Sequence, residues 1–418
     1  MRPQKNSDNS IIFFEPDLTE TTTIARIKEA IQGGYHPVVF GFRRGRYNID
    51  YVAPWPEIVL GRTQDARYWR RIKALFGALP VILKHRRCVA SGAAFLARNL
   101  DQLLLALFAR FFFNRDAILV YEVVDIQPAF TRQGLRGTLI RHIERRCLKH
   151  IDLLIVSSPA FIQHYFATTQ RYRGEWLLLE NKLRQSDLAD ACTLARGAAT
   201  PRPPQPRRWV IGYFGLIRGQ ATIELIARLA KILPDRVEFV FRGILTTVDH
   251  AWFHAMVAET ENIRYEGEYT NPDDLAALYG SVDFAWAIDL EDMQCNSRWL
   301  LPCRFYEAGF FGVPCLAVRS FEIGRMIDCL DVGWTFDAPL EQALTRFFSS
   351  LSRSGYEQKR ERLLASPTSA FVAGEEDKVL CNAIERLIRR YRDDGGSMPL
   401  GTSIGSAKSV SAETLEVN

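Results

Sequence analysis

Several familiar signatures are absent from this sequence of 418 residues. It has no G-x-G-x-x-G and no G-K-[ST], the glycine-rich patterns of ordinary dinucleotide-binding and P-loop proteins. It also has no D-x-D, the carboxylate pair with which many enzymes hold a metal ion on a diphosphate, since Glu291 and Asp292 are adjacent rather than alternating. We therefore expect no divalent metal in its chemistry.

The chain also lacks long apolar runs and paired cysteines. No run reaches the 18 apolar residues that suggest a membrane-spanning helix, and the nearest approach, Leu103–Phe113, fits a buried helix or one in a membrane interface. The first residues have no signal-peptide apolar core. The eight cysteines show no C-x-x-C spacing, so we expect free thiols in a reducing compartment. These features predict a cytoplasmic protein.

Positive charge is concentrated in the first half. Residues 1–190 hold 28 Lys and Arg against 18 Asp and Glu, whereas the remainder holds 25 against 30. The excess lies in Arg62–Arg87 and Arg132–Lys149, and each cluster alone could be a solvated helix face. A basic half favours an anionic partner such as a diphosphate or a lipid surface. Nucleic acid is not expected, because aromatic and basic residues do not alternate in one stripe.

The hydrophobic pattern alternates short apolar runs with amphipathic segments, which is typical of an α/β protein with parallel sheets. We expect residues 62–113 to be mostly helical and residues 215–220 to form a glycine-bearing loop. Elsewhere the pattern predicts strands at 11–14, 37–41, 117–123, 153–157, 176–179, 209–214, 237–242, 263–266, 283–287 and 315–318.

A change in composition near the middle of the chain indicates two domains. Four prolines fall within Pro201–Pro206, and such a segment suits a linker. We predict an N-terminal Rossmann-like domain over 1–190, a linker over 191–208 and a second Rossmann-like domain over 209–373. A helix at 374–392 would follow, crossing back to the first domain, and then a disordered tail at 393–418.

The most informative motif is L-P-C-R-F-Y-E-A-G-F-F-G-V-P at 301–314. It predicts a short helix with Arg304 and Glu307 one turn apart, followed by a buried strand. At the mouth of a parallel sheet, the arginine would bind diphosphate oxygens and the glutamate would accept hydrogen bonds from ribose hydroxyls. The alternative is an ordinary surface ion pair.

Other residues of the second half are candidates for the same ligand. Gly215 and Arg218 follow a strand and precede a helix, where backbone and charge can contact a phosphate; the alternative is a tight turn with a solvent-facing arginine. Arg242 repeats this placement at the end of the next strand. Asn296 closes a polar segment from Asp289 that could face a sugar or position Arg304.

The first half offers candidates for a second substrate. Asp125 follows a strong strand and could act as a general base toward a hydroxyl group, or instead cap the next segment. Glu122 is less well placed, because the apolar run ends only after Val124. Asp17 and Thr21 on the first strand-to-helix loop, with Arg44 on the second, are candidate acceptor-binding residues.

Taken together, these motifs resemble the GT-B glycosyltransferases of the family-4-like kind, especially bacterial exopolysaccharide enzymes of the succinoglycan type. The resemblance covers about residues 11–392 and rests most firmly on two segments, Y-E-G-E-Y-T-N-P-D-D-L-A-A-L-Y at 265–279 and the motif at 301–314. It implies two Rossmann-like domains whose parallel sheets face each other across a cleft.

The resemblance also implies residue roles. The glutamate matching Glu307 binds the nucleotide ribose, and basic residues matching Arg218 and Arg304 contact the diphosphate. The second glutamate that the family often has eight residues earlier is Trp299 here, and the usual phosphate-loop lysine is not evident. These departures leave open whether the sugar configuration is retained or inverted.

The implied reaction moves a hexosyl unit from a nucleoside-diphosphate sugar to a saccharide linked to a polyprenyl diphosphate, without metal or other cofactor. The acceptor would be met at the inner face of the cytoplasmic membrane, with the basic first half as a candidate contact for anionic lipid. Two alternatives remain open. One is a nucleotide-sugar epimerase on the same fold, and the other is a non-catalytic scaffold.

Overall fold

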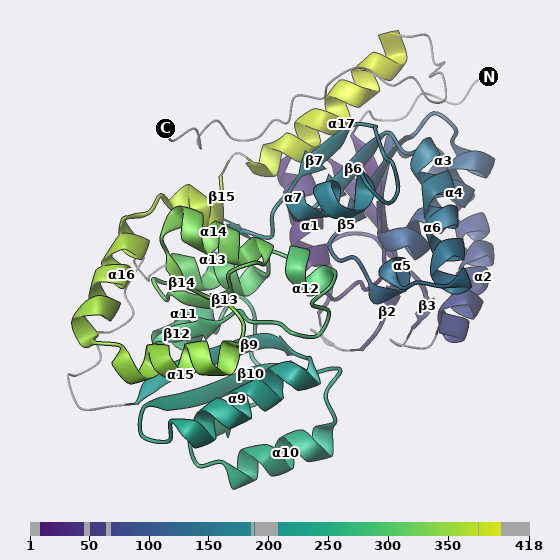
Figure 1. Ribbon diagram of the computed structural model, residues 1–418. Coiled ribbons are helices and arrows are strands. Elements are labelled where there is room, and N and C mark those ends of the chain that lie inside the picture. The colour runs from purple at the N-terminus through teal and green to yellow at the C-terminus, as the bar shows by residue number, and fades with distance from the viewer. Residues whose placement is uncertain are drawn as a thin grey trace, which may run out of the picture. The chain divides into compact units, whose positions relative to one another are not determined.

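The computed structural model describes residues 9–45, 51–63, 68–184, 188, 208–374 and 376–393 (Figure 1). The chain divides into two compact units, one of Met1–Glu180 with Glu375–Asn418 and one of Asn181–Gly374. The predicted linker, apart from residue 208, and the predicted tail, apart from residue 393, lie outside the described residues. None of the described helices is both long and apolar enough to cross a membrane.

The first unit is built on one parallel sheet of seven strands. The strands at the centre of this sheet are buried on both faces, and they therefore read as nearly continuous apolar runs. In spatial order they are β3 (Glu57–Arg62), β2 (His36–Arg43), β1 (Ser10–Glu15), β4 (Ala94–Arg98), β5 (Ile118–Val123), β6 (Leu153–Val156) and β7 (Trp176–Leu178).

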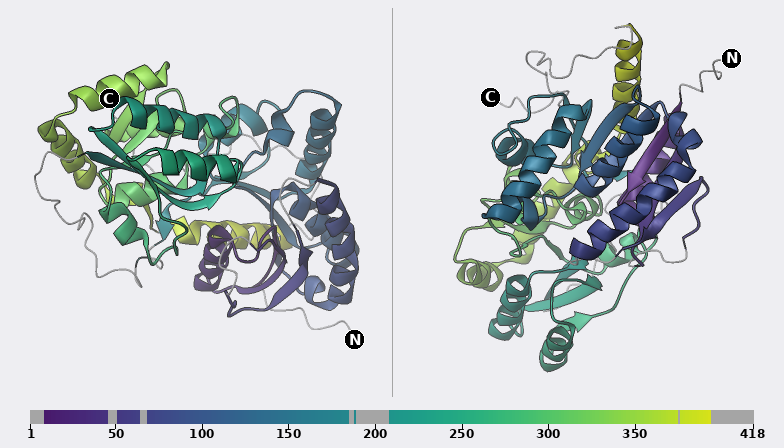
Figure 2. Two further views of the ribbon diagram at one scale, coloured as in Figure 1. Left: turned by 90° about the horizontal axis from the view of Figure 1, so that it is seen from below. Right: turned by 90° about the vertical axis from the view of Figure 1, so that its right-hand side faces the viewer.

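The helices of this unit come from both ends of the chain. The last helix, α17, packs on α1 and shares a core with one face of the sheet, as Figure 2 shows in yellow beside purple. Leu380, Ile384 and Leu387 of α17 are fully buried there. The helices are α1 (Thr21–Gln32), α2 (Tyr68–Lys84), α3 (Arg86–Ala90), α4 (Asn99–Phe113), α5 (Pro128–Thr131), α6 (Leu135–Cys147), α7 (Pro159–Phe161) and α17 (Glu376–Asp393), with a π-helical turn at Ile162–Phe166.

The prediction of a mostly helical segment over 62–113 was wrong at one important place. Strand β4 lies inside it, between β1 and β5 at the centre of the sheet. All five of its residues are buried, and a short fully buried strand shows no alternation by which to distinguish it from a helix. Because β4 was missed, the residue at its end, Arg98, was missed as well.

The second unit contains a six-stranded parallel sheet. In spatial order its strands are β11 (Ile263–Tyr265), β10 (Val237–Leu245), β9 (Trp209–Ile217), β12 (Phe284–Trp286), β13 (Cys315–Val318) and β14 (Gly333–Phe336). Its helices are α9 (Gln220–Ile232), α10 (His250–Glu259), α11 (Leu275–Gly280), α12 (Asn296–Trp299), α13 (Cys303–Phe310), α14 (Glu322–Leu330), α15 (Leu340–Ser350) and α16 (Arg353–Ala365).

A two-stranded parallel pair also belongs to this unit. Strand β8 (Leu183–Arg184) pairs with β15 (Val372–Ala373). This pairing assigns residues 181–184 to the second unit, before the boundary predicted at residue 190. Each strand is only two residues long, so the sequence has no pattern from which the pair could be predicted.

The segment predicted as a loop from Gly215 is partly strand. Strand β9 continues to Ile217, in register with β10 up to Leu245. Two facing glycines allow this, Gly215 with φ +96° and Gly243 with φ +134°. A Cβ on Gly243 would lie 1.8 Å from the carbonyl oxygen of Gly215, so only glycine fits between these two strand ends.

Candidate functional site

The site of the second unit is centred on Arg304, in the first turn of α13. Its guanidinium lies near the carbonyl oxygens of Trp286 (3.3 Å) and Leu216 (3.4 Å), which end the neighbouring strands β12 and β9. The same group lies over the ring of Tyr213, 4.5 Å from its centroid. Among the described residues Arg304 forms no ion pair, so the site keeps a fixed and half-buried positive charge.

Gly215 lies directly beside this charge. A Cβ at this position would be 3.9 Å from Nη2 of Arg304 and 3.8 Å from the hydroxyl of Tyr269. The absence of a side chain exposes the β9 backbone next to the guanidinium. Backbone and cation together form a surface on which phosphate oxygens can be bound.

Glu307 lies one turn after Arg304 on the buried face of α13. Its Oε2 accepts a hydrogen bond of 2.7 Å from the hydroxyl of Tyr279, and its Oε1 accepts one of 3.1 Å from the amide of Asn271. Burial raises the pKa of Glu307, while the two donors and the nearby Arg304 act in the opposite direction. A carboxylate accepts about four hydrogen bonds, so capacity remains for hydroxyl groups of a ligand.

Arg218 is held differently from Arg304. It pairs with Asp289 at 2.7 Å and with Glu291 at 3.4 Å. All three side chains are largely buried, with exposed fractions between 18% and 29%. These carboxylates neutralise its charge, and a phosphate would have to compete with them. The acidic segment after β12 therefore positions Arg218.

The two remaining candidates of the second half lie apart from these contacts. Arg242 donates to the carbonyl oxygen of Glu268 at 2.7 Å, and its Nε is buried without a partner. Asn296 begins α12, where its backbone N–H donates to the carboxylate of Asp292 at 3.3 Å. Among the described residues, no hydrogen bond joins Arg242 or Asn296 to Arg304 or Glu307.

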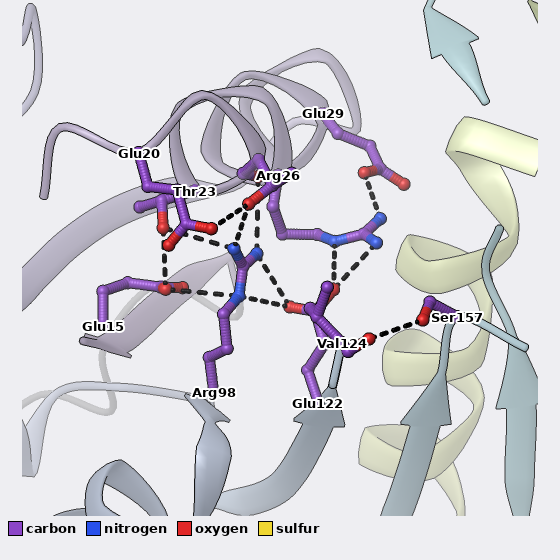
Figure 3. Close-up of polar contacts among 10 residues, drawn as sticks. Glu15, Glu20, Thr23, Arg26, Glu29, Arg98, Glu122, Val124 and Ser157 are labelled. Atoms are coloured by element: carbon purple, nitrogen blue, oxygen red, sulfur yellow. Dashed lines mark hydrogen bonds and ion pairs between the residues drawn. The ribbon is translucent and has the colours of Figure 1, made fainter. Parts of the chain in front are cut away.

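The first unit contains a buried charge network at the carboxyl ends of β1, β4 and β5 (Figure 3). At its centre is Arg98, whose side chain is 2% exposed. Its guanidinium contacts Glu122 at 3.1 Å and Glu15 at 3.4 Å. It also donates to the hydroxyl of Thr22 at 2.8 Å and to the carbonyl oxygen of Thr22 at 3.3 Å.

A second arginine completes the network. Arg26 of α1 contacts Glu122 at 2.9 Å and also pairs with Glu29. The two arginines hold the pKa of Glu122 at about 2, against the effect of burial. Glu122 was judged less well placed than Asp125 for catalysis; the structure shows that its carboxylate is fully engaged with arginines.

In and beside this network, two carboxylates each keep one oxygen without a hydrogen bond to any described residue. Glu15 accepts through Oε2 from Thr23 at 3.1 Å, and its buried Oε1 has no hydrogen bond. Burial raises the pKa of Glu15 to about 7, although Arg98 lowers it. Asp17 accepts through Oδ1 from the backbone and hydroxyl of Thr19, and its buried Oδ2 has no hydrogen bond.

The structure gathers most of the predicted acceptor residues. Glu20, which precedes Thr21 at the start of α1, interacts electrostatically with Asp17, Arg44 and Arg98. Asp17, Thr21 and Arg44 thus belong to one region at the ends of β1 and β2. Asp125 is exposed, two residues after β5 ends.

One signal could have revealed the buried network. Arg26 lies between Ile24 and Ile27 in α1, and Glu29 follows shortly after them. All are on the buried, apolar face of the helix, where a solvated charge is not expected. A charged pair on the buried face of a helix implies buried partners. Among the residues that the structure describes, no group of three or more His, Cys, Asp or Glu side chains could hold a metal ion.

Comparison with solved structures defines the class of the fold. Sucrose-phosphate synthase from Thermosynechococcus elongatus is similar with a TM-score of 0.67 at 14% identity, covering 91% of this chain and 100% of that one. Anabaena HepE, determined in complex with UDP and glucose, is similar with a TM-score of 0.62 at 15% identity, covering 90% and 99%. The fold is the GT-B fold of glycosyltransferases, as predicted.

Comparison with curated sequences identifies the family. No family model matches the chain. The succinoglycan biosynthesis protein ExoL of Rhizobium meliloti is 32% identical over 378 residues, which are 90% of this chain and 92% of that protein. The chain belongs to the family of ExoL, which confirms the resemblance to succinoglycan-type glycosyltransferases.

Proposed function

We propose that this protein is a glycosyltransferase of exopolysaccharide biosynthesis that moves a hexosyl unit from a nucleoside-diphosphate sugar to a saccharide acceptor. The second unit would bind the donor and the first unit the acceptor. The observation that carries the proposal is Arg304, a fixed positive charge held by two carbonyl oxygens and an aromatic ring. An arginine in such a setting is suited to stabilise a diphosphate leaving group.

Glu307 and Gly215 support the same ligand. With the diphosphate at Arg304, the carboxylate of Glu307 lies one helical turn away, at a spacing suited to the ribose of the same nucleotide. The open backbone at Gly215 supplies a close approach for phosphate oxygens. HepE, which shares the fold, was determined with UDP-glucose, so uridine donors are the first to test.

For the acceptor we propose a saccharide carried on a polyprenyl diphosphate. Succinoglycan is the product named for the relative ExoL, and building such a polymer requires successive transfers to a growing saccharide. We further propose that transfer needs no divalent metal, because the sequence contains no D-x-D. The hydroxyl oxygen of the acceptor would form the new bond at the anomeric carbon as the bond to the diphosphate breaks. Its proton would pass to Asp125 if the sugar configuration is inverted, or to the departing diphosphate if it is retained.

We also propose that the first unit contacts anionic membrane lipid. Large apolar side chains are exposed on two of its helices, among them Phe76 of α2 (69% exposed) and Phe111 and Phe112 of α4 (59% and 61% exposed). The sequence of Arg62–Arg87, which includes α2, is rich in basic residues. Exposed aromatic side chains beside cationic ones favour the interface of an anionic bilayer.

An assay of product formation tests the proposal. Purified protein is incubated with radiolabelled UDP-, GDP-, ADP- and TDP-hexoses, with EDTA or Mg²⁺, and with synthetic polyprenyl-diphosphate-linked mono-, di- and trisaccharides. A glycosyltransferase lengthens one lipid-linked saccharide and releases the nucleoside diphosphate only when that acceptor is present. Conversion of the donor sugar without acceptor would favour an epimerase, and inactivity with every donor would favour a scaffold.

A further inference from the structure

Arg98 connects the two ends of the loop between β1 and α1. Its Nε faces Glu15, the last residue of β1, at 3.4 Å. Its Nη1 donates to the hydroxyls of Thr22 and Thr23 in the first turn of α1, at 2.8 Å and 3.3 Å. The short segment 16–21 is therefore clamped at both ends by one guanidinium (Figure 3).

All the donor capacity of this arginine is used. The guanidinium has five N–H groups, and the contacts to Glu15, Glu122, Thr22 and Thr23 engage all three nitrogens. Glu122 itself is fixed by Arg26 from the other side. A lysine could not replace this arrangement, because an ammonium group has three donors and no planar fork.

The clamped loop contains a carboxylate whose capacity to accept hydrogen bonds is not fully used. Asp17 lies in it, 1% exposed; its Oδ1 accepts from Thr19, and its Oδ2 has no hydrogen bond to any residue that the structure describes. The middle of the loop is tied to β2, because the backbone N–H of Leu18 donates to the carbonyl oxygen of Phe42 at 2.9 Å. A carboxylate oxygen that no described residue engages, on a loop held at both ends and in the middle, is suited to accept a hydrogen bond from a hydroxyl group of a ligand.

We propose that Arg98 is a positioning residue for acceptor use: it holds the β1–α1 loop so that Asp17 can accept a hydrogen bond from a hydroxyl group of the acceptor saccharide. Arg98 itself contacts no substrate, because Glu122, Thr22 and Thr23 already engage its N–H groups. This inference rests on the proposed function only in assigning the saccharide acceptor to the first unit.

The first test uses Arg98→Lys with Arg110→Lys as matched control. Arg110 is another largely buried arginine of the first unit (17% exposed), and it pairs at 3.2 Å with Asp152, just before β6, at the amino ends of the strands. With the lipid-linked saccharide that the wild type accepts, Arg98→Lys raises the acceptor KM about tenfold or more. The donor KM stays unchanged, and Arg110→Lys changes neither.

Thr22→Val keeps the inference testable if Arg98→Lys does not fold. It removes the hydroxyl that Arg98 contacts at 2.8 Å but keeps the shape of a half-buried residue. We expect a smaller rise of the acceptor KM, about threefold. A rise of donor and acceptor KM by the same factor in either variant would show a merely structural role and overturn the inference.

Amide hydrogen exchange gives a readout that needs no acceptor. In Arg98→Lys or Thr22→Val, the amides of residues 17–22 exchange faster, while those of β9 and β10 in the second unit do not. Unchanged exchange in this loop for both variants would overturn the positioning role, even if donor binding by the second unit is confirmed. Failure of donor binding, in contrast, overturns the proposed function and leaves the loop result standing.

Discussion

Arg98 and Arg304 occupy similar places in the two units and are held in opposite ways. Each lies at the carboxyl ends of parallel strands, where α/β proteins bind ligands. Arg98 is enclosed by the carboxylates of Glu15 and Glu122, whereas the guanidinium of Arg304 contacts carbonyl oxygens and the ring of Tyr213 and forms no ion pair with a described residue. A neutralised arginine fixes structure, and an arginine whose charge is not neutralised can bind an anion. The location alone does not distinguish the two.

Arg304→Met gives the sharpest test of this difference. It removes the charge proposed to stabilise the diphosphate, so kcat/KM for transfer falls by about 10²- to 10³-fold. The control is Arg236→Met. Arg236 also donates to carbonyl oxygens, those of Phe348 and Ser349, but it lies just before β10, at the amino ends of the strands. Equal losses in the two variants would contradict a specific role of the Arg304 charge in transfer.

Glu307→Gln separates ribose from phosphate recognition. The amide keeps the volume of the side chain but accepts fewer hydrogen bonds, so affinity for a nucleoside diphosphate falls about tenfold or more. Affinity for inorganic pyrophosphate, which has no ribose, stays the same. Isothermal titration calorimetry with both ligands measures this, and a parallel loss for pyrophosphate would argue against a ribose contact at Glu307.

A buried carboxyl group of the first unit predicts how the free energy of unfolding changes with pH. Glu144 of α6 is buried among Tyr121, Tyr165 and Gln170, and burial raises its pKa to about 7 despite these donors. The folded state holds this proton more tightly than the unfolded state, so its stabilising effect is present below about pH 4.5 and is lost as the pH rises through 7.

The variant Glu144→Gln isolates this contribution. The wild type loses on the order of 3 kcal/mol of unfolding free energy through this group between about pH 4.5 and pH 8, and the variant lacks that part of the slope. Urea unfolding at several pH values checks it. Identical slopes for the two proteins would mean that Glu144 does not hold a proton in the folded state.

The smallest expected effect concerns the membrane. Phe111→Ser and Phe112→Ser each weaken binding to vesicles of phosphatidylglycerol and phosphatidylcholine by about threefold to tenfold, because less apolar surface enters the interface. Ile232→Ser, at an exposed apolar position of the second unit (47% exposed), is the control. Co-sedimentation that is equal for all three variants would exclude these phenylalanines as the contact.

The sequence predicted the regular parts of the fold because their periodicity is local. Strand β13 was predicted with the bounds that the structure shows. Strand β4 was not, since its burial on both faces depends on the sheet around it. The end of β9 was missed for a similar reason: Gly215 suggested a turn, but its close approach to Gly243 extends the strand.

The sequence identified the residues of the proposed donor site, but not the ion pairs that its arginines form. The motif at 301–314 identified Arg304 and Glu307 because both lie in one short segment. The neutralisation of Arg218 by Asp289 and Glu291, and of Arg98 by Glu15 and Glu122, depends on residues far apart in the chain. Only their positions in the folded units reveal these pairs.

The most direct measurement is a thermal-shift series with UDP, GDP, ADP, TDP and their hexose derivatives, with and without Mg²⁺, on the wild type and on Arg304→Met. We expect one nucleotide class to stabilise the wild type without Mg²⁺, by about 2.7 kcal/mol at 100 times its Kd, and to leave Arg304→Met unshifted. Stabilisation that persists in Arg304→Met, or no stabilisation by any nucleotide, would contradict a donor site built on this arginine.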